Sequence, residues 1–178
     1  MADIKVHDHT FKPYIPADEV QKRVKAIARQ MEEDHRGDVP LFIPVLNGAF
    51  RFASDLFSYY DGPAEITFVR LASYSGTQST GNVRELVSLN ADIRDRRVIV
   101  VEDIVDTGRT VDRIMETLSH HQPAEVKLAS LLLKPEAYKG SHPVDYLGFE
   151  IPNLFVLGYG LDYDGLGRNL NDIYQIKS

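Results

Sequence analysis

The run Val98–Val101 is the feature that most constrains how this chain can fold. Four consecutive β-branched residues are typical of a central parallel strand, which is buried on both faces and therefore shows no polar alternation. Two further apolar runs, residues 41–46 and 126–133, are predicted to form strands of the same sheet. Helical patterns alternate with these runs along the chain. The sequence therefore predicts an α/β fold with a central, mostly parallel, twisted sheet that is flanked by helices.

Helical spacing of apolar side chains predicts three helices. The first begins at Asp18, which is predicted to cap it in a capping box with Gln21, and ends within residues 34–38. The other two cover residues 50–57 and 111–118. Shorter strands are predicted over residues 64–71, 83–89, 146–149 and 155–157. Because no linker, repeat or low-complexity tract interrupts the chain, residues 1–178 are predicted to form one domain.

Charge and composition narrow the possible functions. The formal net charge is −6 over 178 residues, which makes the chain a poor general binder of nucleic acid. The absence of cysteine excludes disulfides and thiolate metal sites. No apolar run reaches the roughly 18 residues that cross a bilayer, and the N-terminus lacks a signal-type apolar core, so we expect a cytoplasmic protein without a membrane partner. Phosphate binding in an acidic chain would need local N–H groups, a cation or a few basic residues.

The segment after Val101 carries the strongest chemical signal. Glu102-Asp103 lies at the expected carboxyl end of the central strand, where ligands of open parallel sheets bind. The turn that follows places two hydroxyls, a glycine and a cation before a predicted helix, whose N-terminal N–H groups can hold phosphate. It consists of Asp106, Thr107, Gly108, Arg109 and Thr110. Two solvated acids and an ordinary helix cap are the alternative interpretations.

Two other segments have competing interpretations. Residues 73–82 are small, polar and without a pattern, so they form either a linker between strands or a lid over an active site. The histidines at His7-Asp8-His9 and at residues 120–121 could suggest a metal. Neither group has a full set of ligands nearby, so surface histidines are expected.

The segment 98–110 resembles the phosphoribosyl-diphosphate motif of type I phosphoribosyltransferases: four apolar residues, Glu-Asp, two apolar residues and Asp-Thr-Gly-x-Thr. Other segments resemble the hypoxanthine and hypoxanthine-guanine branch of that family. They are Val45–Ala49, Ser73-Tyr74, Gln78–Gly81, Leu132–Lys134, Gly148–Pro152, Phe155-Val156 and Gly158–Tyr163. The resemblance covers residues 41–172 and implies the family fold, with a small hood subdomain formed by the terminal segments.

The resemblance implies transfer of a 5-phosphoribosyl group from phosphoribosyl diphosphate to hypoxanthine or guanine, with Mg²⁺ as cofactor and pyrophosphate as product. Asp106 would act as general base and acid at purine N7. Glu102 and Asp103 would face the ribose hydroxyls directly or through magnesium. The turn residues would hold the 5′-phosphate: Thr107, Gly108, Arg109 and Thr110.

Later positions would bind the purine and the pyrophosphate. Lys134 would contact the oxygen at purine C6, Phe155 would stack on the base, and Val156 would offer its backbone to the base edge. Asp162 would lie at the purine side and support a second magnesium, and Arg168 would meet the pyrophosphate. Ser73 and Tyr74 would lie in the lid.

One turn departs from the family. Many relatives carry Lys-Gly there, joined by a non-proline cis peptide at the pyrophosphate, whereas this chain has Asn47-Gly48. Asparagine keeps a hydrogen-bond donor but loses the cation. We therefore expect Asn47 and Gly48 to bind pyrophosphate without a strong charge effect, and a strained peptide between them is a hypothesis.

The resemblance also implies a homodimer or homotetramer, without a nucleic-acid partner. A messenger-RNA-binding regulator of the same fold is the main alternative, but it would favour a basic face, and no Lys/Arg-rich stripe is evident in the sequence. A second alternative is a phosphoribosyltransferase that acts on xanthine or on a pyrimidine. Residue identities do not rank hypoxanthine, guanine and xanthine, because recognition of the 2-amino group depends on backbone carbonyls.

Overall fold

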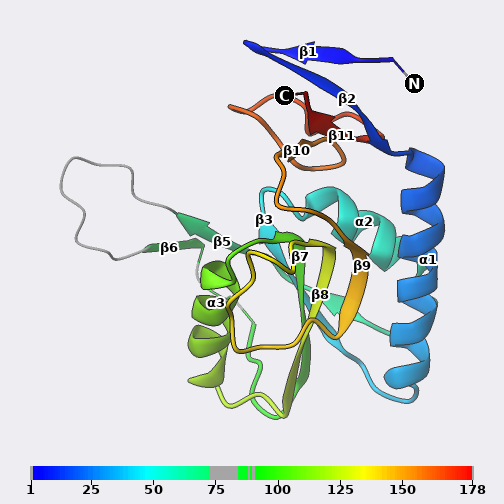
Figure 1. Cartoon of the computed structure of the whole chain (residues 1–178). Helices are drawn as coiled ribbons and strands as arrows, with labels where there is room; N and C mark the ends of the chain where they lie inside the picture. Colours follow the sequence, from blue (N-terminus) through cyan, green and yellow to red (C-terminus); the bar gives the residue numbers. More distant parts are fainter. Residues whose placement is uncertain (1, 73–83, 88, 90, 178) are drawn as a thin grey trace.

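The computed structural model describes residues 2–72, 84–87, 89 and 91–177. A central sheet has the strand order β6-β5-β3-β7-β8-β9, with β4 paired to β3 (Figure 1). Its members are β3 (Leu41–Leu46), β4 (Glu65–Ile66), β5 (Val69–Ala72), β6 (Arg84–Val87), β7 (Arg97–Val105), β8 (Glu125–Leu133) and β9 (Tyr146–Glu150). All pairings are parallel except that of β5 with β6, so the predicted mostly parallel sheet is confirmed.

Three helices cover the two faces of this sheet. Helices α1 (Ala17–Asp34) and α2 (Phe50–Tyr59) pack on one face, and α3 (Arg109–Ser119) packs on the other (Figure 1). The buried residues of α3 are Val111, Ile114, Met115 and Leu118, whose spacing places them on one side of the helix. Each face of the sheet therefore has its own apolar core. No helix in the described part of the chain has the length and apolar character that a membrane span requires.

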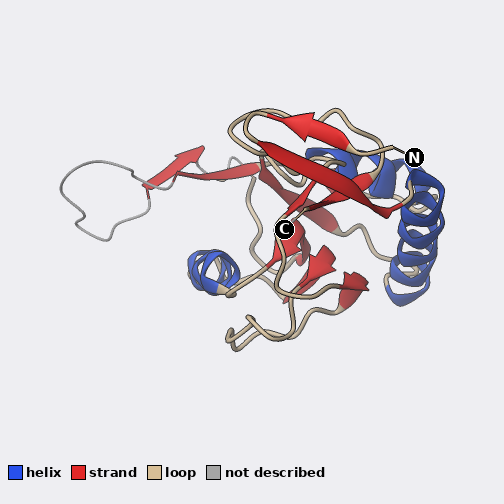
Figure 2. Ribbon diagram, turned by 45° about the horizontal axis from the view of Figure 1, so that its top comes forward, coloured by secondary structure: helices blue, strands red, loops and turns tan. Residues whose placement is uncertain are grey.

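A second, antiparallel sheet joins the two terminal segments of the chain. We call it the hood sheet; its order is β1 (Ile4–Val6), β2 (His9–Ile15), β11 (Ile173–Ile176) and β10 (Val156–Leu157). Figure 2 shows β1 and β2 alongside the C-terminal end of the chain. Phe11, Leu157 and Tyr174 form its small buried core. This sheet confirms the predicted hood.

Several local predictions need correction. Helix α1 begins at Ala17 after Pro16 and has no side-chain cap, so the proposed Asp18–Gln21 capping box is wrong. Gln21 instead bonds Asp55 and Tyr59. The single strand predicted over 64–71 is divided into β4 and β5, because each part pairs with a different portion of β3.

Candidate active site

Two acidic residues lie inside the central strand near its carboxyl end. Strand β7 continues to Val105, so Glu102 and Asp103 belong to it rather than following it. Glu102 is only 5% exposed, and its Oε1 has no hydrogen-bond partner among the residues that the structure describes. Burial, followed by the charge of Asp103, raises the pKa of Glu102 well above its ordinary value. Burial also raises the pKa of Asp103 to about 6, while hydrogen bonds from the backbone oppose this change. Two solvated acids are therefore excluded.

The turn between β7 and α3 is built around a glycine. Gly108 has φ +90° and directly precedes α3 without capping it by a side chain. A Cβ at this position would lie 2.9 Å from the backbone nitrogen of Gly140, so only glycine fits without displacement. The first intrahelical bond runs from Asp112 N–H to the Gly108 carbonyl, which leaves the N–H groups of residues 109–111 without intrahelical partners. These N–H groups give the turn the donors that an anion needs.

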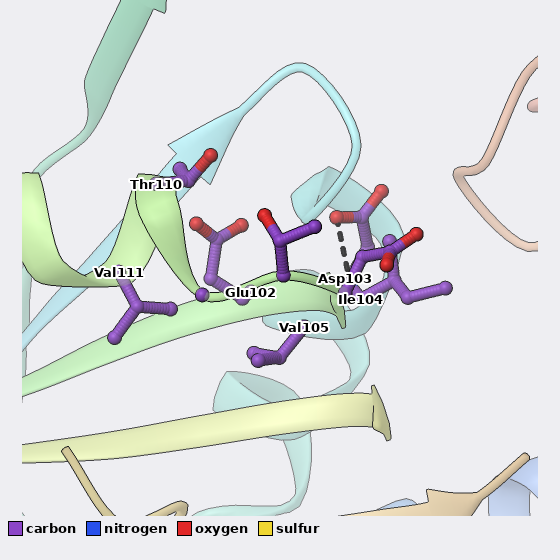
Figure 3. Close-up of a pocket in the computed structure, with 9 residues that line it drawn as sticks. Glu102, Asp103, Ile104, Val105, Thr110 and Val111 are labelled. Atoms are coloured by element: carbon purple, nitrogen blue, oxygen red, sulfur yellow. Dashed lines mark hydrogen bonds between the residues drawn. The ribbon is translucent and has the colours of Figure 1, made fainter. Parts of the chain in front are cut away.

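A pocket of about 290 Å³ opens at this turn (Figure 3). Glu102 on β7 and Thr110 at the start of α3 line it from neighbouring elements. Its other lining residues are Asp103, Ile104, Val105, Asp106, Thr107, Gly108 and Val111. Arg109 is exposed and is not among the lining residues. The pocket therefore combines the buried Glu102 carboxylate and two half-buried ones, those of Asp103 and Asp106, with the hydroxyls and backbone N–H groups of the turn.

A second pocket of about 280 Å³ shares Asp103, Ile104 and Asp106 with the first. It is also lined by Lys134, Phe155, Val156, Leu161 and Asp162. Lys134 is buried and donates to Asp106 over 2.8 Å. Phe155, by contrast, is 43% exposed. A phenylalanine that lines a pocket with so much open surface offers a flat apolar face to a ring.

The loop that ends this pocket is fixed by its own ion pair. Arg168 contacts Asp162 at 2.6 Å and donates to the Gly160 carbonyl over 2.6 Å. The other Asp162 oxygen accepts a hydrogen bond from the Gly165 N–H. A Cβ on Gly160 would clash with the Gly48 carbonyl oxygen, and a Cβ on Gly48 would clash with the Asp103 carboxylate. The loop therefore packs directly against the backbone of the turn after β3, and this turn packs directly against the Asp103 side chain of β7.

The structure corrects the hypothesis about the turn after β3. Its cis peptide lies between Leu46 and Asn47, not between Asn47 and Gly48. Gly48 is needed here for another reason, since its missing side chain leaves room for Asp103.

Sequence reasoning missed a group that holds the loop in place. Arg51 on α2 donates to the Leu170 carbonyl over 2.7 Å and to Asn171 Oδ1 over 2.9 Å, and it lies 5.0 Å from the centre of the Tyr159 ring. Tyr159 in turn donates to Asp55 over 2.6 Å. Only the helical spacing of Arg51 and Asp55 on the first turns of α2 could have indicated a shared face.

The described residues provide neither the predicted lid nor a preformed metal cluster. Ser73 and Tyr74, assigned to the lid, lie outside the part of the chain that the structure describes. Among the described residues, no three histidine or acidic side chains form a ready metal cluster. Magnesium commonly uses only one or two protein carboxylates together with substrate oxygens and water. Glu102, with its unpartnered buried oxygen, and the neighbouring Asp103 fit that requirement.

Comparison with known proteins gives a consistent result. A family model described as a phosphoribosyl transferase domain matches residues 16–164. The hypoxanthine-guanine phosphoribosyltransferase of Bacillus subtilis is 35% identical over 167 residues, which cover 93% of each chain. The crystal structure of a hypoxanthine-guanine phosphoribosyltransferase from Bacillus anthracis has a TM-score of 0.87 at 36% identity and covers 94% of this chain and 97% of that one. The bifunctional protein TilS/HprT of Listeria monocytogenes is 39% identical over 173 residues, and the chain spans 27% of its length.

Proposed function

Because the chain belongs to the hypoxanthine-guanine branch of the phosphoribosyltransferase family, we propose that it catalyses phosphoribosyl transfer in purine salvage. The acceptor is a 6-oxopurine, hypoxanthine or guanine, and the products are the nucleotide and pyrophosphate. One observation carries this proposal beyond the family relationship. A phosphate-type pocket and a pocket with an open aromatic face share Asp106, as a sugar donor and a flat acceptor would require.

The first pocket suits the donor. We infer that the N–H groups at the start of α3, with the Thr107 and Thr110 hydroxyls, bind the 5′-phosphate. Glu102 and Asp103 then face the ribose hydroxyls or the metal. Positive charge develops on the ribose as its bond to pyrophosphate breaks, and buried carboxylates stabilise that charge. We propose that Asn47, Gly48 and Arg168 face the departing pyrophosphate.

Magnesium fits the donor set and remains a proposal. Glu102, Asp103 and Asp162 would offer hard oxygen ligands. Burial raises the pKa of Glu102 and of Asp103, so a cation beside them would stabilise their charged forms. When bound, the ion would neutralise charge on the pyrophosphate oxygens.

The second pocket suits the purine. Phe155 stacks on the ring, the Val156 backbone meets its edge, and Lys134 donates to the oxygen at C6. Asp106 accepts the proton from N7 while N9 forms its bond to C1′ and the pyrophosphate leaves with the electrons of the broken C–O bond. Lys134 donates a hydrogen bond to the Asp106 carboxylate over 2.8 Å, which holds the two proposed groups side by side at this pocket.

A substrate panel tests the proposal. Purified protein with Mg²⁺ and phosphoribosyl diphosphate should convert hypoxanthine to its nucleotide. The same assay ranks guanine and xanthine as acceptors against hypoxanthine. Adenine is the matched control, because it lacks the C6 oxygen that Lys134 would contact, and it should give no product. Absence of nucleotide with every 6-oxopurine at saturating concentrations would overturn the proposal. We also propose that the enzyme works in the cytoplasm and that it forms a homodimer or homotetramer. Light scattering, which measures the mass of the assembly, tests the oligomeric state.

A further inference from the structure

Three aromatic rings connect the hood sheet to the proposed purine pocket. Phe155 and Tyr163 meet edge to face, with ring centres 5.7 Å apart and planes at 76°. Phe11, which is fully buried in the hood sheet, lies 6.2 Å from each of them. Phe155 therefore has ring neighbours on the side of the hood, while 43% of it remains exposed. Such an arrangement can fix the plane of an otherwise mobile ring.

The turn between β1 and β2 holds the second ring of this group. The Tyr163 hydroxyl donates to Asp8 Oδ1 over 2.8 Å. The imidazoles of His7 and His9 lie 5.6 Å and 5.4 Å from the centre of the Tyr163 ring. The sequence His7-Asp8-His9, which suggested a metal at first sight, thus surrounds a tyrosine.

The backbone at Tyr163 is also constrained. Tyr163 and Leu166 exchange two backbone hydrogen bonds of 2.9 and 3.1 Å across a tight turn. Within this turn the Gly165 N–H donates to Asp162, which lines the proposed purine pocket. The backbone of Tyr163 is therefore held by the turn at residues 163–166, and its hydroxyl is held by Asp8 in the hairpin of β1 and β2, which we call the N-terminal hairpin.

We propose that Tyr163 is a positioning residue for the purine: anchored by Asp8, it sets the orientation in which Phe155 offers its face to the base. This inference rests on the proposed function, since it assumes that Phe155 stacks on the acceptor. Tyr163 itself is not among the residues that line the pocket, so it acts through Phe155. The hairpin would thus contribute to base affinity without contacting the base.

The size of the effect follows from the ring pair. Edge-to-face aromatic pairs contribute about 0.5–1.5 kcal/mol beyond area burial, and this energy orders Phe155 before the ligand arrives. Tyr163→Leu should therefore weaken binding of a purine nucleotide by about twofold to tenfold. Binding of ribose 5-phosphate, which has no base, should stay unchanged.

Equilibrium binding of inosine monophosphate and of ribose 5-phosphate to the full chain tests the inference, with Y163L, F155L and the double variant compared. Tyr174→Phe is the control, because Tyr174 lies in the hood sheet, against whose core Tyr163 packs, and it also donates to a carboxylate, that of Asp172. We expect Y163L to weaken only the nucleotide, and we expect no further loss when Y163L is added to F155L. Should Y163L fail to fold, Y163F keeps the ring but loses the bond to Asp8 and should weaken the nucleotide by about twofold.

Other outcomes separate the two proposals. Wild-type nucleotide affinity in Y163L, while F155L binds more weakly, would overturn the positioning role alone. If Y163L weakens binding of both ligands equally, the inference is also overturned, because Tyr163 would then act on the whole fold. If Y163L weakens nucleotide binding as much in the F155L background as in the wild type, Tyr163 acts independently of Phe155, and the inference is overturned as well. If F155L binds the nucleotide as the wild type does, the assignment of Phe155 in the proposed function is wrong, and the inference falls with it.

Discussion

Asp103→Asn is expected to stabilise the ligand-free protein even though it removes a carboxylate of the proposed site. Burial raises the pKa of Asp103 from 3.8 to about 6, so the folded state holds this proton more tightly than the unfolded chain does. Ionising the group therefore costs folding free energy as the pH rises from about 4 to about 6, and the full cost remains above that window. The difference between the two pKa values corresponds to about 3 kcal/mol, which is the upper value for the gain from the neutral, isosteric asparagine.

Urea unfolding at pH 7.5 and at pH 5.0 measures this effect. D103N should be more stable than the wild type by as much as about 3 kcal/mol at pH 7.5, and by about half as much at pH 5.0, where the folded carboxyl is mostly protonated. Asp61→Asn is the control, because Asp61 is exposed and has no hydrogen bond or ion pair among the described contacts. Its effect should stay within about 0.5 kcal/mol at both pH values.

The pH dependence decides whether the reasoning holds. A D103N variant that is no more stable than the wild type at pH 7.5 would refute it. So would a gain of the same size at both pH values, because buried charge would then not be its cause. The same variant should bind Mg²⁺ with phosphoribosyl diphosphate more weakly, which titration calorimetry would detect.

Three other substitutions test separate parts of the site. Asp106→Asn should lower kcat by about 100-fold or more while nucleotide affinity stays within about threefold, and wild-type turnover in a steady-state assay would contradict the base assignment. Gly108→Ala should lower stability by about 1–3 kcal/mol, because alanine is strained at φ +90° and its Cβ approaches Gly140; an unchanged melting curve would argue against the tight turn. Asn47→Lys should strengthen pyrophosphate inhibition by about twofold to fivefold at low salt, and no change would place the pyrophosphate away from this turn.

The centre of the fold was predictable because its patterns are strong. Val98–Val101 and the spacing of the α3 residues indicated a buried strand and a helix that both exist, and β3 has the predicted bounds. The sequence placed Glu102 and Asp103 after the strand, since acidic residues rarely continue a buried one. Pairing with β8 extends the strand through them, which only the sheet reveals.

The periphery was less predictable because its structure depends on distant partners. Strand β2 contains Pro13 and alternates weakly, and it is completed by β11 from the opposite end of the chain. Apart from the helical spacing of Arg51 and Asp55, the sequence carries no local signal for the roles of Arg51 and Tyr159, because their partners lie in distant segments of the chain. The site chemistry was thus visible in one segment, whereas the framework that holds it was not.

The hood sheet has a consequence for the order in which the pocket is synthesised. Phe11 pairs with Ile176, and Ile15 pairs with Ile173, so this sheet has very high contact order. Strands β3, β7 and β8 can assemble on the ribosome while β2 still waits for residues made more than 150 positions later. The donor pocket can therefore exist before the purine wall does. A ribosome-bound chain whose emerged part ends between residues 140 and 154 should already recognise a sugar phosphate, yet it should not discriminate among bases, because Phe155 and the residues after it have not emerged.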